Sequence, residues 1–124
     1  MTDYLTVADV VAMHEDLISR YGGSHGLRDP GMLEAALYRP QTGYYADLIG
    51  EAAALWESLS QNHAFVDGDK RVAFAAALVF LTINGVEFDA DADAAWDFLA
   101  PLYEGGDMRF EVLEPWLRRN TRPL

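Results

Sequence analysis

Residues 72–83 read VAFAAALVFLTI and form the longest apolar run in the chain. Placed on a helix, this run is apolar on nearly all sides, which predicts a buried helix. Asn84 and Gly85 follow it and provide a C-terminal stop. The run is shorter than the roughly 20 apolar residues that span a bilayer. We therefore expect it to form the central helix of a soluble fold.

The segment directly before this helix, residues 63–71, reads HAFVDGDKR. The first turn of a helix has unpaired N–H groups and partial positive charge, so it is a natural anion site. Lys70 and Arg71 would lie in that turn, where a cation is disfavoured by roughly 0.3–1 kcal/mol. Gly68 lets the backbone approach a ligand closely. These features indicate phosphate binding. The alternative is that Asp69 only caps the helix and both cations are solvated.

Two further residues of this segment offer chemistry. His63 follows Leu59 by one helical turn, so it should lie where the apolar face of the preceding helix ends. Its imidazole, with an ordinary pKa of about 6.5, can take a hydroxyl proton at neutral pH. Asp67 supplies a hard oxygen ligand suited to Mg²⁺, which binds one or two carboxylates plus substrate phosphates. We assign Phe65 to the core, where it anchors the loop.

Capping residues and helical spacing of apolar residues predict further helices on both sides of this segment. Before it, we expect helices over about 6–21, 29–39 and 47–62. After it, we expect a fifth helix that begins at Asp89 or Asp91, and a short last helix over about 111–119. His14 and His25 have no second ligand at metal spacing, so we interpret both as surface histidines.

In the fifth helix we expect Trp96, Leu99 and Tyr103 to point inward and Pro101 to kink or interrupt the helix. Pro115 is expected only in the first turn of the last helix. No segment alternates with period two, and no repeat or linker is evident. The sequence therefore predicts one all-α domain over residues 1–124, a compact bundle of about six helices around the buried central one.

Composition limits the function classes. The 124 residues are 51% hydrophobic and include no Cys, which argues against disorder, disulfides and thiolate metal sites. The net charge of −11 disfavours nucleic acid and anionic membranes as partners and suits a basic protein partner. The N-terminus lacks the positive region of a signal peptide. We expect a cytoplasmic protein.

Residues 63–71 resemble the signature of the Fic/Doc family, His-x-Phe-x-(Asp/Asn)-(Ala/Gly)-Asn-(Lys/Gly)-Arg. Lys70 stands where Fic enzymes have Gly, so the resemblance is to the Doc (death-on-curing) branch. It continues in RYGG at 20–23, LRDPG at 27–31 and NG at 84–85. It covers most of residues 5–85. Asp69 departs from the pattern, which has Asn at that position.

The resemblance implies a function and a site. His63 would be the base, Asp67 the metal ligand, and Lys70 and Arg71 the phosphate ligands, with ATP and Mg²⁺ as cofactors. Doc-type members transfer the terminal phosphate of ATP to a threonine of the translation factor elongation factor Tu, which halts translation. They are toxins that a small Phd-like antitoxin neutralises. Fic-type members transfer AMP to a hydroxyl instead.

Asp69 keeps two alternatives open. A carboxylate cannot donate a hydrogen bond to a phosphate oxygen as an amide can, and it repels the phosphate. Two unit charges 4 Å apart interact by about 4 kcal/mol at an effective dielectric of 20. A second carboxylate can also help to hold the metal. Two alternatives to the kinase-type toxin therefore remain: a Fic-type AMP-transferring enzyme and a catalytically impaired binding module.

Overall fold

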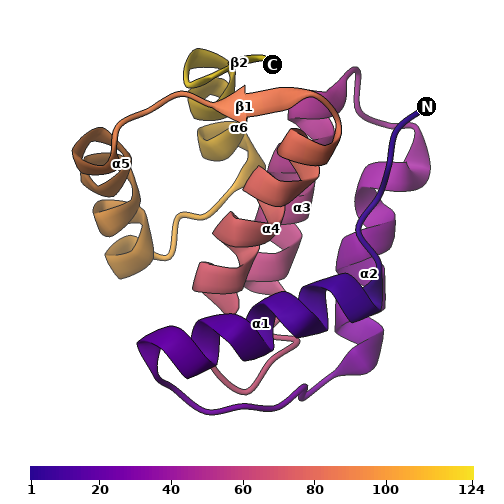
Figure 1. The fold of residues 1–124 in the computed structure, drawn as a ribbon, viewed down its shortest axis with the longest axis vertical. Helices are drawn as coiled ribbons and strands as arrows, with labels where there is room; N and C mark the ends of the chain where they lie inside the picture. The colour runs from indigo at the N-terminus through magenta and orange to yellow at the C-terminus, as the bar shows by residue number, and fades with distance from the viewer.

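The computed structural model describes residues 1–124 and consists of six α-helices, one short 3-10 helix and one small sheet (Figure 1). In chain order the elements are α1 (Val7–Tyr21), α2 (Pro30–Tyr38), η1 (Arg39–Thr42), α3 (Leu48–Gln61), α4 (Asp69–Ile83), β1 (Val86–Phe88), α5 (Ala92–Gly105), α6 (Phe110–Arg119) and β2 (Thr121–Pro123). The predicted all-α bundle of about six helices is confirmed. None of these helices has both the length and the hydropathy that crossing a membrane requires.

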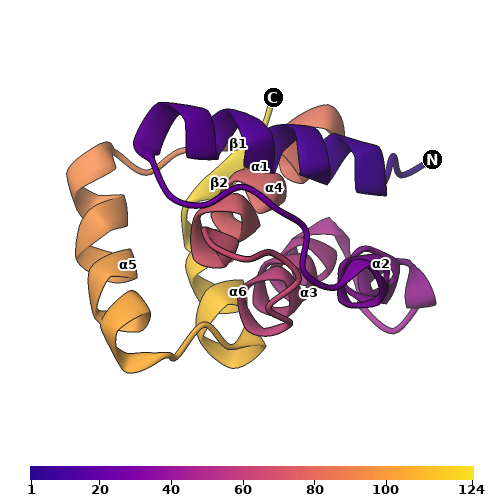
Figure 2. The ribbon, with the colours of Figure 1, turned by 90° about the horizontal axis from the view of Figure 1, so that it is seen from below.

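Helix α4 lies at the centre of the bundle, as its apolar run predicts, but its burial is incomplete, because Val79 is 38% and Ile83 46% exposed. It packs most extensively against α3, and α1 crosses it (Figures 1 and 2). Both helices bury alanines completely, among them Ala52 and Ala53 on α3 and Ala73 and Ala76 on α4. Small side chains at the contact let two helix axes come close together. The end of α3 and the start of α4 are therefore held firmly beside each other.

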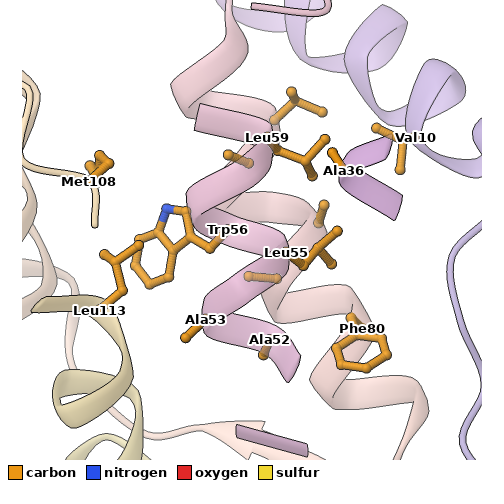
Figure 3. Packing of buried hydrophobic residues seen from close by; sticks show 14 of the residues in the cluster. Val10, Ala36, Ala52, Ala53, Leu55, Trp56, Leu59, Phe80, Met108 and Leu113 are labelled. Carbon is orange, nitrogen blue, oxygen red and sulfur yellow. The ribbon is translucent and has the colours of Figure 1, made fainter. Parts of the chain in front are cut away.

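Larger side chains complete the core (Figure 3). Trp56 on α3 is fully buried, and Figure 3 shows its indole on the side of Met108 and Leu113. Phe65, in the loop between α3 and α4, is 3% exposed and belongs to the same buried cluster. The predicted role of Phe65 as a core anchor for the loop is thus confirmed. Its burial restrains the backbone of the residues on either side.

Side chains cap four of the helix N-termini. The side chains of Thr6, Asp29, Asp47 and Asp91 each accept a hydrogen bond from a backbone N–H in the first turn of the helix that follows. Thr6 also forms a reciprocal capping box with Asp9. Such caps depend on residues a few positions apart, so the sequence alone locates these helix starts closely.

Neither of the two internal prolines interrupts its helix. Helix α5 continues through Pro101, and Pro115 lies in the second turn of α6, beyond the first turn in which it was expected. A proline leaves the carbonyl four residues before it without its helical hydrogen bond. Here those carbonyls belong to Asp97 and Glu111, and both residues are exposed, as are the prolines. Water can therefore satisfy the freed carbonyls, which lowers the cost of each proline.

A small antiparallel sheet was not anticipated from the sequence. Strand β1, which follows Gly85, pairs with β2 at the C-terminal end of the chain, with Val86 opposite Pro123 and Phe88 opposite Thr121. Strands of three residues are too short to show a period-two pattern. The pairing brings the end of α4 next to the end of α6 and leaves α5 as a separate column (Figure 1).

Candidate functional site

A cavity of about 550 Å³ lies at the N-terminal end of α4. Its lining includes all six residues that the sequence singled out, namely His63, Asp67, Gly68, Asp69, Lys70 and Arg71. Ser60, Val66, Trp96 and Tyr103 complete the lining. Figure 2 looks at this end of the molecule, with α1 along the top, α5 at the left and the start of α4 between them. The structure thus brings the predicted residues together, and it adds α5 as a second wall.

His63 lies just beyond the end of α3 and is the only non-glycine residue with a positive φ, at 51°. Its side chain is exposed to the cavity, while its neighbours Ala64 and Phe65 are buried. The His63 carbonyl accepts two hydrogen bonds from the Arg28 guanidinium, from Nε at 3.1 Å and from Nη2 at 2.8 Å. A strained backbone persists only where its surroundings hold it. The two bonds from Arg28 help to hold the His63 backbone in this conformation.

Asp67 is fixed by the loop that follows α1. Its Oδ2 accepts a hydrogen bond from the Ser24 N–H at 3.1 Å, and its Oδ1 accepts one from the Gly68 N–H at 2.9 Å. Each carboxylate oxygen keeps a further acceptor site. No group of three or more His, Cys, Asp or Glu side chains surrounds it. One carboxylate with free acceptor sites fits Mg²⁺, which takes its remaining ligands from water and substrate phosphates.

Asp69 does not cap α4, so the interpretation of it as an N-cap is wrong. The cap position belongs to Gly68, whose φ of 77° is in the left-handed region, and no side chain caps the helix. Asp69 is the first helical residue, and its Oδ1 accepts a hydrogen bond from the Phe65 N–H at 3.0 Å. The carboxylate therefore closes the loop that contains the motif, and it also borders the cavity.

The two cations of the motif contact the C-terminal ends of neighbouring helices. Lys70 Nζ donates to the Tyr103 carbonyl, in the last turn of α5, at 3.1 Å. Arg71 Nη1 donates to the carbonyl of Gly22, the C-cap of α1, at 3.3 Å, and its guanidinium lies 5.4 Å from the centre of the Tyr21 ring. Carbonyls at a helix C-terminus attract cations. These contacts offset the cost of two cations in the first turn of α4.

His14 is buried, with 2% of its surface exposed, and the interpretation of it as a surface residue is wrong. It lies on the same stripe of α1 as Val10 and Ile18, one turn from each, and this spacing is a signal for burial. Its Nε2 lies 2.6 Å from the Asp67 carbonyl oxygen, so a protonated Nε2 donates to it. Its ring stacks on that of Phe65 at 3.9 Å. His14 therefore supports the motif loop from beneath.

His25 is exposed, as expected, and pairs with Glu15 at 3.0 Å.

On the second wall, Trp96 differs from the prediction that it points into the core, because it is 60% exposed. Leu99 is buried as predicted, and Tyr103 is half-buried. Burial raises the pKa of the Tyr103 phenol above its ordinary value, and the charge of Arg71 opposes that rise. The phenol therefore stays protonated at neutral pH, as a neutral donor at the cavity wall.

Comparison with known proteins identifies the family. A sequence model described as the Fic/DOC family matches residues 4–81, which run from the segment before α1 to the last turns of α4. The chain belongs to the Fic/Doc family. It is 47% identical over 98 residues to Toxin Doc of Mycolicibacterium smegmatis, a match that covers 75% of this chain and 73% of that protein. It is 37% identical over 92 residues to Protein kinase doc of Escherichia phage P1, covering 70% and 73%.

The Fic/Doc match ends before α5 begins. The residues from His63 to Arg71 therefore lie inside the part of the chain that the family model describes, and Trp96 and Tyr103 lie outside it. The cavity has one wall from the family motif and one from a helix beyond it.

Proposed function

We propose that this protein is a Doc-type toxin that transfers the terminal phosphate of ATP to a hydroxyl group of a translation factor and thereby arrests translation. Elongation factor Tu is the target that the Doc resemblance implies. The observation that carries the proposal is the meeting of His63, Asp67, Lys70 and Arg71 in one cavity at the start of α4. The names of the relatives, a toxin and a protein kinase, support it.

In the proposed reaction His63 acts as the general base. Its imidazole takes the proton of the target hydroxyl as the hydroxyl oxygen attacks the γ-phosphorus of ATP. The bond from the γ-phosphorus to the β,γ-bridging oxygen breaks, and ADP leaves with that electron pair. The N-terminal N–H groups of α4, together with Lys70 and Arg71, bind the phosphate oxygens and neutralise their charge. Bound Mg²⁺, held by Asp67, would supply further neutralisation of phosphate charge.

Lys70 is the feature that favours phosphate transfer over AMP transfer. Its side chain reaches from α4 to the Tyr103 carbonyl on α5 and so crosses between the two walls of the cavity. A glycine at this position, as in Fic enzymes, would leave that space free. A lysine narrows the room for the α-phosphate end of a nucleotide, which is the end that AMP transfer requires. Mass spectrometry of the target distinguishes the two chemistries, because phosphate adds about 80 Da and AMP about 329 Da.

The proposed role also specifies partners and location. A toxin of this type acts on the translation machinery, so we place it in the cytoplasm. We propose a Phd-like antitoxin as its neutralising partner, and the net charge of −11 suits a basic segment on that partner. Nucleic acid and membrane are not proposed as partners. Co-expression with a neighbouring small reading frame, scored as relief of growth arrest, tests the antitoxin.

Asp69→Asn is expected to strengthen ATP binding and speed transfer, each by roughly tenfold, because it removes one negative charge beside the phosphates. The amide oxygen can still accept the Phe65 N–H, and the amide nitrogen adds a hydrogen-bond donor to a residue that lines the cavity. The free energy of unfolding should change by less than about 1 kcal/mol, because the loop hydrogen bond is retained. Calorimetric titration of ATP and Mg²⁺ into both proteins measures the change.

Asp93→Asn is the matched control, since Asp93 is an acidic first-turn residue of α5 that does not line the cavity. It should leave ATP binding unchanged. Weaker ATP binding in Asp69→Asn would show that the carboxylate works as a metal ligand and that its charge is not an impairment.

Arg28→Met is expected to lower turnover by about ten- to a hundred-fold, because a misplaced catalytic group costs rate steeply. The His63 carbonyl would lose both of its guanidinium hydrogen bonds, while the Arg28 backbone N–H still donates to Ala64 O at 2.7 Å. ATP affinity should not change. Steady-state kinetics and ATP titration separate the two effects.

Arg20→Met, which removes an exposed arginine paired with Asp16, controls for the loss of a surface cation. Arg28→Lys should recover part of the rate through a single donor. Unchanged turnover in Arg28→Met would show that His63 keeps its position without Arg28.

A further inference from the structure

The wall that α5 contributes to the cavity is aromatic. Trp96 and Tyr103 are two helical turns apart and share one face of α5, and their ring centroids are 6.3 Å apart with planes inclined at 49°. Leu99 lies between them on that face and is 4% exposed. The face that bears all three residues is therefore the inward face of α5.

Trp96 is 60% exposed although it lies on this inward face. The other two tryptophans are buried: Trp56 completely, and Trp116 with 6% of its surface exposed. An indole is a large apolar surface, and leaving it in water forgoes the free energy of burial. Trp96 borders the cavity instead of the core, so its ring is open to whatever occupies that space.

We propose that Trp96, with Tyr103 beside it, is the surface on which the base of the nucleotide stacks while the phosphates bind at the start of α4. This inference rests on the proposed function and specifies how the nucleotide lies in the same cavity. Aromatic side chains stack on any nucleobase, because every base has a π-face. The inference thus gives α5 a role in holding the nucleoside half of the substrate.

The distribution of groups around the cavity matches the two halves of a nucleotide. One wall has the helix N-terminus, Lys70 and Arg71, which suit a polyanion, and the other has two aromatic rings, which suit a flat base. Lys70 connects the walls, because its Nζ donates to the backbone carbonyl of Tyr103 at 3.1 Å. The volume of about 550 Å³ is within the range of small-molecule sites, roughly 300–1,000 Å³.

The test compares two ligands that differ by the nucleoside, ATP and inorganic triphosphate, on wild type and Trp96→Ala by calorimetry. We expect the affinity for ATP to fall about five- to a hundred-fold, which is the range for loss of one base–aromatic stack. The affinity for inorganic triphosphate should not change. Trp96→Phe, which keeps an aromatic ring, should recover most of the ATP affinity.

Two further measurements sharpen the result. Tyr44→Ala removes an aromatic ring that is 85% exposed but does not line the cavity, and it should leave ATP affinity unchanged. ATP should also quench the tryptophan fluorescence of the wild-type protein, and Trp96→Phe should lose that quenching, because Trp56 and Trp116 are buried.

Several outcomes would overturn the inference. ATP affinity in Trp96→Ala equal to wild type would show that the indole does not contact the base. An equal loss of affinity for ATP and triphosphate would show that the effect is not on the base. Unchanged ATP affinity with a raised KM for the target protein would assign Trp96 to target docking. If the wild-type protein binds neither ligand, the proposed function is wrong and this inference with it.

Discussion

His63→Ala is expected to reduce phosphate transfer by about 10²–10⁴-fold, the usual contribution of a general base, and to relieve the growth arrest that the proposed function predicts for expression of the wild-type protein. Thermal unfolding should stay nearly the same, because the His63 side chain is exposed and the structure gives it no hydrogen bond that the fold depends on. Growth on induction, transfer rate and thermal unfolding measure the three effects.

The backbone at His63 requires a second variant. Its φ of 51° is in the left-handed region, which asparagine adopts more readily than alanine. His63→Asn removes the base with less added strain, so both variants should lose transfer equally. His25→Ala is the matched control, since His25 is an exposed histidine outside the cavity. A His63→Ala protein that is as toxic as wild type would exclude the general-base role.

Asp67→Ala is expected to abolish the Mg²⁺ dependence of ATP binding and to remove most of the transfer activity. The reason is that Asp67 is the carboxylate at the cavity wall whose oxygens keep free acceptor sites beside the anion-binding end of α4. ATP titrations with and without Mg²⁺, on wild type and variant, measure the dependence.

Asp67 also anchors the loop through Ser24, so alanine removes a structural contact together with the charge. Asp67→Asn keeps an oxygen that can accept one backbone N–H and removes only the charge, and it should show the same loss of metal dependence. Asp107→Ala controls for the loss of an exposed acidic residue elsewhere. Equal Mg²⁺ dependence in wild type and both variants would move the metal ligand elsewhere, with Asp69 the first candidate.

The parts of this structure that the sequence predicts are those that depend on residues close together in the chain. The central helix follows from a continuous apolar run, and helix starts follow from caps such as Asp29 and Asp47. The wall of the cavity that the motif forms is predictable for the same reason, because the motif occupies a loop and the first turn of the next helix. The helix start predicted between them limits how far apart His63 and Arg71 can lie.

Contacts between distant segments could not be predicted in this way. His14 lies beneath the Asp67 carbonyl because α1 crosses the start of α4, and helical spacing alone does not reveal that crossing. Lys70 Nζ meets the Tyr103 carbonyl near the end of α5, 33 residues further along the chain, and no local sequence pattern links the two residues. Trp96 is the clearest example. Helical spacing predicts that it shares a face of α5 with Leu99, but it does not predict that this residue borders a cavity.

The error at Asp69 has a more local cause. A capping aspartate and a first-turn aspartate differ by one position, and Gly68 takes the cap position by adopting a positive φ. Both placements satisfy the same sequence pattern, so only the structure shows that the carboxylate bonds to the Phe65 N–H. Because asparagine can also accept this bond, Asp69→Asn should remove the charge and leave the loop conformation unchanged.

The central claim is that this cavity transfers the terminal phosphate of ATP, and one measurement tests it most directly. Purified protein is incubated with elongation factor Tu, Mg²⁺ and ATP labelled with radioactive phosphorus at either the γ or the α position, with His63→Ala as the blank. Label on elongation factor Tu from γ-labelled ATP alone, absent with His63→Ala, is the predicted result. Transfer of the α label would show AMP transfer instead, and no transfer from either nucleotide would contradict the proposed reaction on this target.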